Sequence, residues 1–193
     1  MIIGLTGTKA SGKGIIADIL KERGFVYYSL SDMVREEAVK RGMKTYNIKD
    51  LQNIGNDLRN RFGNGILANM TLERLKRDIK EGKKKKDYVI DGIRNPWEIE
   101  ESRRFEGYKF ILIAVDAPQE ARFKRLLERA RDSDPKDWQG FLEMDKRDKG
   151  IAEENSGQQV EKCIEMADIK IYNDSSIEVL KDKTEKILRD LKC

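Results

Sequence analysis

Residues 2–14, with the sequence IIGLTGTKASGKG, decide the fold of this chain. The apolar run at 2–6 predicts a short buried strand, and from residue 15 onward isoleucine and leucine recur at the spacing of an amphipathic helix. Between the strand and the helix stands the pattern Gly-x-x-x-x-Gly-Lys, at residues 7–13. A glycine-rich turn in this position is typical of a loop that binds an anion.

The glycines and the lysine of this loop have separate physical roles. Gly7 and Gly12 let the backbone adopt conformations that aim successive N–H groups inward, and the helix that follows adds the positive end of its dipole. Lys13 supplies a charge for the β- and γ-phosphates of a nucleotide. We therefore predict a nucleotide-binding loop that consists of Gly7, Lys9, Ala10, Ser11, Gly12, Lys13, Gly14 and Ile15.

The loop lacks a hydroxyl group that the complete pattern contains. That pattern has Ser or Thr directly after the lysine, where the hydroxyl helps to hold Mg²⁺ or phosphate, but this chain has Gly14 and then Ile15. Ser11 precedes the lysine, so we expect it to compensate only weakly. Magnesium is then expected to be held by phosphates, water and a carboxylate, and we expect slower catalysis without a loss of nucleotide binding.

Strand and helix patterns alternate along the rest of the chain, which favours right-handed crossovers and a mainly parallel sheet covered by helices. This predicts an α/β protein with three layers and five strands, folded as one domain over residues 1–193. Ligands bind such folds at the carboxyl ends of the strands. The predicted strands are 2–6, 25–28, 88–91, 109–115 and 167–172, and the predicted helices follow Gly14 and cover 32–41, 49–61, 65–82, 118–131, 135–148 and 176–191.

Composition excludes several classes of chemistry. The 193 residues include no histidine, so a Ser-His-Asp or Cys-His mechanism and an imidazole zinc site are excluded. Two cysteines, Cys163 and Cys193, make a disulfide scaffold improbable, and no apolar run is long enough to span a membrane. We expect no signal peptide and a reduced, cytoplasmic setting. The lysine run at 83–86 is interpreted as a solvated turn, so nucleic acid is not the expected partner despite the net charge of +4.

With these motifs in place, the chain resembles the P-loop nucleoside monophosphate kinases, in particular archaeal adenylate-kinase-like and dephospho-CoA-kinase-like proteins and deoxynucleoside monophosphate kinases. The resemblance spans nearly the whole chain and implies the P-loop NTPase fold, with ATP and Mg²⁺ as cofactors. It implies an acceptor-binding segment over about residues 30–82 and a lid over about residues 118–150. The phosphate-binding loop is its most specific part.

Two segments resemble acceptor-binding elements of these kinases. In YSLSDMVR, residues 28–35, the resemblance assigns Ser29, Asp32 and Arg35 to the acceptor nucleotide, with Arg35 on its phosphate. The alternative is a helix N-cap with an acidic first turn. In LQNIGNDLRNRFG, residues 51–63, Arg59 resembles a second phosphate ligand in a Gln-x-x-Gly-x-x-x-x-Arg pattern; the alternative is an ordinary surface charge.

Two further segments resemble the magnesium and lid regions. In DGIRNPWEIE, residues 91–100, Asp91 would hold a magnesium-bound water and Arg94 would reach the acceptor or transferring phosphate. The alternative is an aspartate that caps the next helix. In the lid-like segment 122–135, Arg125, Arg129 and Arg131 would neutralise the transferring phosphoryl group, although arginines on a helix often form a solvated face.

The leading hypothesis is phosphoryl transfer from ATP to a nucleoside or deoxynucleoside monophosphate, catalysed by Lys13, Arg94 and the three lid arginines. A dephospho-CoA kinase is a second hypothesis, in which Asp32 would be the general base. A nucleotide-binding regulatory protein with little turnover is a third, and the missing loop hydroxyl supports it. The expected partner is a small nucleotide, with no membrane; the identity of the acceptor and the oligomeric state stay open.

Overall fold

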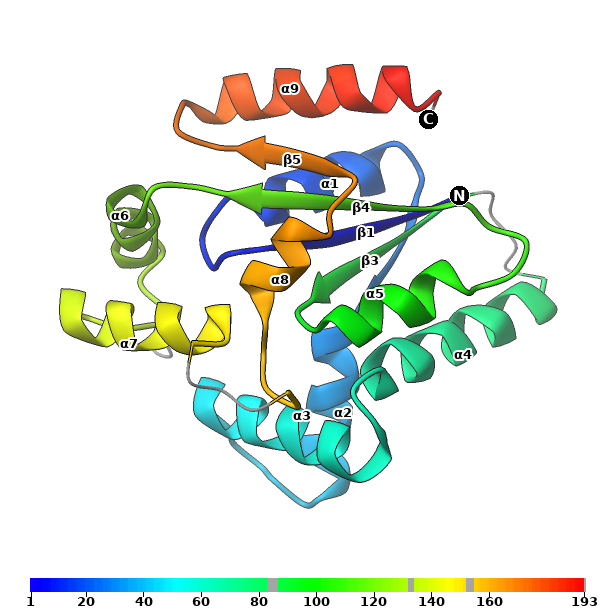
Figure 1. Cartoon of the computed structure of the whole chain (residues 1–193), viewed down its shortest axis with the longest axis horizontal. Coiled ribbons are helices and arrows are strands. Elements are labelled where there is room, and N and C mark those ends of the chain that lie inside the picture. The colour runs from blue at the N-terminus through cyan, green and yellow to red at the C-terminus, as the bar shows by residue number, and fades with distance from the viewer. Residues whose placement is uncertain (83–86, 132–133, 152–154, 193) are drawn as a thin grey trace.

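A five-stranded parallel sheet forms the centre of the molecule (Figure 1). The computed structural model describes residues 1–82, 87–131, 134–151 and 155–192. The strands are β1 (Ile2–Gly7), β2 (Val26–Ser29), β3 (Tyr88–Ile93), β4 (Phe110–Asp116) and β5 (Ile169–Tyr172). They lie in the order β2-β3-β1-β4-β5, and every neighbouring pair is parallel. The predicted α/β architecture is confirmed.

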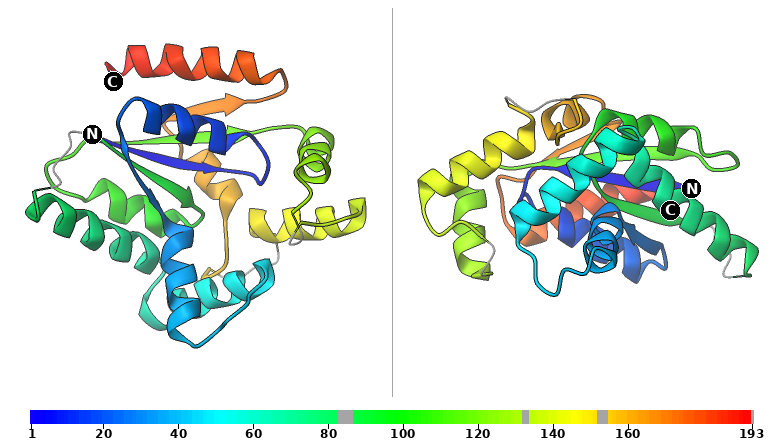
Figure 2. Two further views of the ribbon diagram at one scale, coloured as in Figure 1. Left: turned by 180° about the vertical axis from the view of Figure 1, so that it is seen from behind. Right: turned by 90° about the horizontal axis from the view of Figure 1, so that it is seen from below.

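Helices cover both faces of this sheet (Figure 2). They are α1 (Lys13–Glu22), α2 (Leu30–Lys40), α3 (Ile48–Phe62), α4 (Ile66–Lys80), α5 (Pro96–Arg103), α6 (Gln119–Arg129), α7 (Trp138–Lys149), α8 (Val160–Glu165) and α9 (Ile177–Asp190). Alternate residues of each strand point to opposite faces. Ile3 and Leu5 of β1 therefore pack with α1 and α9, whereas Ile2 packs with the helices of the other face.

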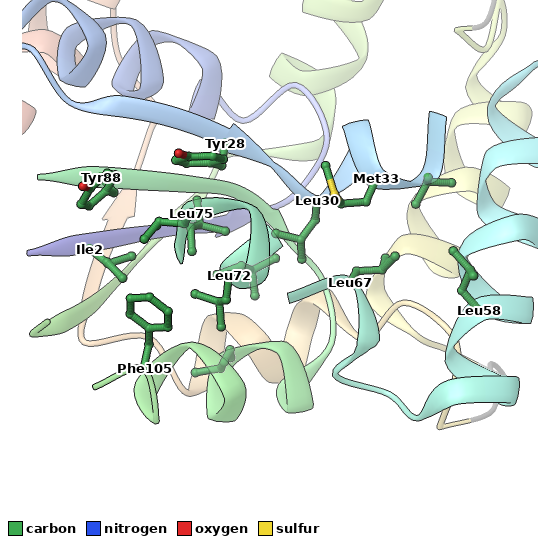
Figure 3. Close-up of a cluster of buried hydrophobic side chains, with 14 of the residues drawn as sticks. Ile2, Tyr28, Leu30, Met33, Leu58, Leu67, Leu72, Leu75, Tyr88 and Phe105 are labelled. Carbon is green, nitrogen blue, oxygen red and sulfur yellow. The ribbon is translucent and has the colours of Figure 1, made fainter. Parts of the chain in front are cut away.

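The larger apolar cluster joins the sheet to the segment between α2 and α5 (Figure 3). Tyr28 and Tyr88 come from neighbouring strands, Met33 comes from α2, and Leu72 and Leu75 come from α4. Burying each large apolar side chain contributes about 1.5–3 kcal/mol. The cluster thus joins α2, which packs on β3, to α4, which packs on α2, α3 and α5.

Several boundaries differ from the sequence prediction. α5 and α8 were not predicted: α5 has no pronounced apolar face, and it starts because Asn95 and Glu98 form a capping box with Pro96 at the first helical position. The predicted helix over 118–131 ends at Arg129, so Arg131 lies beyond it. The last strand is shorter than predicted and begins at Ile169.

Within the described ranges, no helix is long and apolar enough to cross a membrane. The lysine run at 83–86 and Cys193 lie outside the described residues, so the interpretation of that run as a solvated turn stays a prediction. Cys163 is buried, and burial raises the pKa of its thiol.

Candidate functional site

A cavity of 870 Å³ opens at the carboxyl ends of β1, β2 and β3. It is bounded by the β1–α1 loop, by α2 and α3, and by the end of α6. Of the residues predicted from the sequence, every one except Gly7 lines this cavity. They are Lys9, Ala10, Ser11, Gly12, Lys13, Gly14, Ile15, Ser29, Asp32, Arg35, Arg59, Asp91, Arg94, Arg125, Arg129 and Arg131.

The backbone of the loop takes its shape from two glycines. Gly7 has a φ of 140°, and a Cβ atom there would lie 2.0 Å from the carbonyl oxygen of Val115 on β4. Gly12 has a φ of 107°, and a Cβ atom there would lie 2.6 Å from Asn173 Nδ2. A side chain at either position would collide with its neighbour, which explains why both positions require glycine.

Two side chains hold the loop from outside by its carbonyl groups. Asn173 Nδ2 donates a hydrogen bond to the carbonyl oxygen of Ser11 at 2.7 Å. Arg125 Nη1 donates to the carbonyl oxygens of Ala10 and Ser11 at 3.2 and 3.4 Å. The backbone N–H of Ser11 in turn donates to the carbonyl oxygen of Thr8 at 3.3 Å, which closes a turn inside the loop. Arg125 therefore supports the loop, a contact that the sequence did not predict.

Lys13 and Asp91 carry opposite charges at the floor of the cavity. Lys13 Nζ lies 4.0 Å from Asp91 Oδ1, and Tyr27 Oη donates to Asp91 Oδ2 at 2.9 Å. Burial lowers the pKa of Lys13, and the charge of Asp91 partly offsets this. The hydrogen bond to Asp91 and burial together raise the pKa of Tyr27, with burial the larger cause.

Two buried oxygen atoms beside Lys13 have no hydrogen-bond partner among the described residues: Ser11 Oγ and Asp91 Oδ1. Leaving a buried polar atom unpaired costs about 1–3 kcal/mol, so such atoms mark places where a ligand completes the bonding. Both are hard oxygen donors of the kind that Mg²⁺ accepts. The described residues hold no group of three or more acidic, cysteine or histidine side chains suited to a metal. The residues thus fit a magnesium ion that is held largely by nucleotide phosphates.

The other two lid arginines are arranged differently from Arg125. Arg129 donates through Nε and Nη2 to the two oxygens of Asp134, at 2.5 and 2.8 Å. This bidentate pair keeps the planar guanidinium at the wall of the cavity. Arg131 follows the end of α6 and also lines the cavity.

Lys9 stands at the same wall, half-buried. Burial lowers the pKa of its ammonium group to about 8, opposed by the charges of Asp148 and Asp134. A bound polyphosphate would supply the negative charge that this site lacks.

The three residues predicted to bind the acceptor, Ser29, Asp32 and Arg35, lie together at the start of α2. Ser29 Oγ accepts a hydrogen bond from the backbone N–H of Ser31, so it caps the helix as the alternative interpretation expected. Arg35 Nη1 donates to Asp32 Oδ1 at 2.7 Å, and both side chains are about half exposed. An exposed pair of this kind is weak, so an incoming anion can displace it.

Arg59 has a buried partner. Its Nε and Nη2 donate to Glu98 Oε1 at 3.1 and 2.7 Å. The other oxygen of Glu98 accepts from the backbone N–H groups of Arg94 and Asn95, at 2.8 and 3.1 Å. Two of the three guanidinium nitrogens of Arg59 are therefore engaged with α5, which joins the acceptor-side helix α3 to the turn that carries Arg94.

Arg94 is held by residues that the sequence did not assign. Its Nη1 donates to Gln158 Oε1 at 2.9 Å and lies 3.6 Å from Asp148 Oδ1. Gln158 lines the cavity, and Asp148 is buried behind it. Both come from parts of the chain more than fifty residues distant, so no local pattern could have identified them.

Comparisons with known proteins identify the family of this chain. Residues 3–161 match the family model AAA_18, described as an AAA domain. A UPF0200 protein of Pyrococcus horikoshii is 35% identical over 190 residues, which cover 97% of this chain and 96% of that protein. A UPF0200 protein of Pyrococcus abyssi is 37% identical over 193 residues, which cover 99% and 97%.

Solved structures of low sequence identity share the fold. Shikimate kinase from Aquifex aeolicus superposes with a TM-score of 0.53 at 16% identity, covering 100% of this chain and 96% of that one. A gluconokinase from Sinorhizobium meliloti gives a TM-score of 0.54 at 9% identity, with coverages of 98% and 91%. The fold is that of the P-loop kinases, and the chain belongs to the UPF0200 family and carries an AAA_18 domain.

Proposed function

We propose that this protein transfers the γ-phosphoryl group of ATP to a nucleoside or deoxynucleoside monophosphate. One observation carries the proposal. A single cavity is lined both by the phosphate-binding loop with Lys13 and by a second set of cationic side chains from other elements, Arg35 and Arg94. Two separate cationic groups facing one space suit two phosphate-bearing ligands that meet in line.

On this proposal the residues of the chain have distinct tasks. The loop amides and Lys13 bind the β- and γ-phosphates of the donor, and Arg35 and Arg94 align the acceptor phosphate. Arg129 and Arg131 stabilise the charge that spreads over the equatorial oxygens of the transferring group, because planar guanidinium groups contact two oxygens at once. Phosphoryl transfer is chiefly a matter of positioning and charge neutralisation, so it needs no histidine.

Ser11 and Asp91 would hold the magnesium ion together with the phosphates. When bound, Mg²⁺ supplies further neutralisation of charge between the donor phosphates. The two unpaired oxygens of these residues, described above, support this assignment.

Binding of nucleotide with little turnover is the second candidate function. The observation in its favour is that neither Gly14 nor Ile15 offers a hydroxyl, and the side chain of Ile15 packs partly against the apolar cluster under α1. Such a protein would bind ATP through the loop and release little ADP with any acceptor.

A coupled ADP-release assay separates these functions. Purified protein with Mg·ATP is offered a panel of ribo- and deoxynucleoside monophosphates, together with dephospho-CoA. We expect acceptor-dependent ADP release with at least one monophosphate, and its loss in Lys13→Ala. Release with dephospho-CoA alone would identify the ribose hydroxyl as the acceptor. If no acceptor on the panel caused ADP release while the protein still bound ATP, the kinase function would be rejected in favour of nucleotide binding without turnover.

A further inference from the structure

Asp148, at the end of α7, is a buried carboxylate that the proposed mechanism does not use. Its Oδ1 accepts a hydrogen bond from Gln52 Nε2 at 3.1 Å and lies 3.6 Å from Arg94 Nη1. The Asp148 side chain is 4% exposed, whereas Gln52 and Arg94 both line the cavity. The carboxylate therefore lies behind two cavity-lining side chains, on the side away from any ligand.

The position is electrostatically unfavourable for a site that binds phosphate. A carboxylate repels a phosphate group across a short distance of low dielectric constant. A buried negative charge here therefore weakens anion binding unless it does something else that binding needs. The partners of Asp148 indicate its role: it contacts Gln52 from α3 and Arg94 from the turn after β3.

The chemistry of Gln52 fixes its orientation. A carboxylate only accepts hydrogen bonds, so the amide group must present Nε2 to Asp148, and the carbonyl oxygen is left for the cavity. Arg94 is fixed in the same way, since Asp148 and Gln158 both engage its Nη1 atom and leave other donors of the guanidinium for a ligand. Each contact restricts the rotamers of the side chain before a ligand arrives. Less conformational entropy is then lost when the ligand binds.

The segment that delivers Asp148 and Gln158 is itself anchored to the turn that carries Arg94. The backbone N–H of Gln159 donates to the carbonyl oxygen of Arg94 at 2.7 Å. Gly150, which ends α7, comes so close that a Cβ atom there would lie 2.7 Å from the carbonyl oxygen of Gln158. The end of helix α7 and the segment before α8 are therefore packed and hydrogen-bonded to the turn that carries Arg94.

We propose that Asp148 and Gln158 are positioning residues for the acceptor site: they hold Arg94 in the orientation that receives the acceptor phosphate, and Asp148 also leaves the carbonyl oxygen of Gln52 to accept a hydrogen bond from a donor group elsewhere on the acceptor. The inference rests on the proposed function in so far as Arg94 is the acceptor-phosphate ligand. It assigns a role to the end of α7 in acceptor binding, in addition to the lid role of the arginines on and after α6.

Inorganic phosphate is a suitable probe, because its binding is measured without turnover. It is titrated by calorimetry into protein whose donor site is saturated with Mg²⁺ and a non-hydrolysable ATP analogue. The variants are Asp148→Asn, which keeps the size of the side chain, and Asp148→Ala. Glu143→Gln is the matched control, because Glu143 lies on the exposed side of the same helix and loses the same charge. Circular dichroism and affinity for the ATP analogue show that each variant is folded.

The sign of the change decides the proposal. Loss of repulsion alone would make phosphate bind more tightly in both Asp148 variants. Loss of positioning makes phosphate bind more weakly, by about tenfold in Asp148→Ala, because a misaligned charge-assisted hydrogen bond costs about tenfold in affinity. The loss should be smaller in Asp148→Asn. Affinity in Glu143→Gln is expected to stay at the wild-type value. Equal or tighter binding in both Asp148 variants would overturn the proposal.

The dependence on Arg94 supplies a second test. In an Arg94→Ala background, phosphate binding should fall, and Asp148→Asn should then no longer weaken it, since the positioning effect acts through Arg94. Undetectable phosphate binding by the wild type, or unchanged binding in Arg94→Ala, would also overturn the inference. If an acceptor is found, its KM should rise in Asp148→Asn by a larger factor than the KM for ATP, because the charge of Asp148 also acts on Lys9 and Lys13. Failure of the ADP-release panel would sink the proposed function alone, because the phosphate titration needs no turnover.

Discussion

Lys13 Nζ faces Asp91 Oδ1 at 4.0 Å, and the two residues follow from the pairing of two strands. In the register of the sheet, Leu5 of β1 lies opposite Asp91 of β3. Strand β1 ends two residues later, at Gly7, and the phosphate-binding loop follows it. Lys13, at the end of this loop, lies beside the carboxylate of Asp91. The cation that receives a nucleotide therefore has a fixed anionic partner before the nucleotide arrives.

Replacing Asp91 with Asn should shift the pH dependence of ATP binding to lower pH. Burial already lowers the pKa of Lys13, and the charge of Asp91 raises it. Without that charge the pKa falls further, and the ammonium form that binds phosphate is lost at a lower pH. We therefore expect the midpoint of ATP binding to move to lower pH in Asp91→Asn. Fluorescence titrations with an ATP analogue between pH 6 and 10 measure this; superimposable profiles for the two proteins would contradict it.

Gly14→Ser should restore the missing hydroxyl and raise activity. A Cβ atom at this position would meet no described atom within 4 Å, and its backbone does not adopt a positive φ. A serine therefore fits directly after Lys13. A new hydrogen bond to a charged group contributes about 1.5–3 kcal/mol, which corresponds to at least a tenfold gain in kcat or in magnesium affinity.

Gly14→Ala is the matched control for this gain. It adds the Cβ atom and stabilises α1 by about 1 kcal/mol through helix propensity, but it supplies no hydroxyl. Its kcat and its half-saturating magnesium concentration should equal those of the wild type. An equal gain in both variants would assign the effect to the helix and not to the hydroxyl.

The sequence predicted those parts of the site that are continuous in the chain. The loop at 7–14 contains its own strand end, glycines and lysine, so local pattern and geometry coincide. Asp91 and Arg94 could be placed near the loop because the carboxyl ends of parallel strands lie at the same edge of a sheet. The helix α5 was missed because its start depends on the capping box of Asn95 and Glu98 and not on an apolar stripe.

What the sequence did not predict depends on contacts between distant segments. The sequence suggested Arg59 as a phosphate ligand, or else as a surface charge, and neither interpretation included its buried partner Glu98, which lies 39 residues further along the chain. Asn173 and Arg125 support the loop from positions more than a hundred residues away. Periodicity and spacing describe neighbours in the chain, so pairings of this kind become visible only in the folded molecule.

Lys9→Arg should remove part of the alkaline loss of nucleotide affinity. Burial lowers the pKa of Lys9 to about 8, and a polyphosphate restores the charged form. Below pH 8 the ammonium group is protonated in the free and bound states, so affinity is constant. Above pH 8 the free protein must take up a proton to bind, and affinity falls by up to tenfold per pH unit. Arginine stays charged throughout this range.

The measurement is the Kd of an ATP analogue at pH 7, 8, 9 and 10 in both proteins. We expect the two curves to coincide near pH 7 and to diverge above pH 8, with the smaller loss in Lys9→Arg. Lys13 is present in both proteins, so any loss of affinity that it causes at high pH is the same in the two curves. Parallel curves over the whole range would show that Lys9 does not contact the nucleotide.

Arg122→Ala should destabilise the fold by about 3–5 kcal/mol, because it leaves Asp145 buried without its main partner. Arg122 Nη1 and Nη2 donate to the two oxygens of Asp145 at 2.6 and 3.0 Å, and both side chains are at most 2% exposed. Burial alone would raise the pKa of Asp145, but the hydrogen bonds from Arg122 and Gln119 lower it. The pair joins α6 to α7, the helix that carries Asp148.

Urea unfolding followed by circular dichroism measures the loss, with Arg104→Ala as the control. Arg104 pairs with Glu101 at 3.4 Å, but its side chain is 64% exposed, so its removal should cost no more than about 1 kcal/mol. The double variant Arg122→Met with Asp145→Leu should be more stable than Arg122→Ala, because it leaves no unpaired buried charge. Equal stabilities for Arg122→Ala and Arg104→Ala would mean that the buried pair does not hold the two helices together.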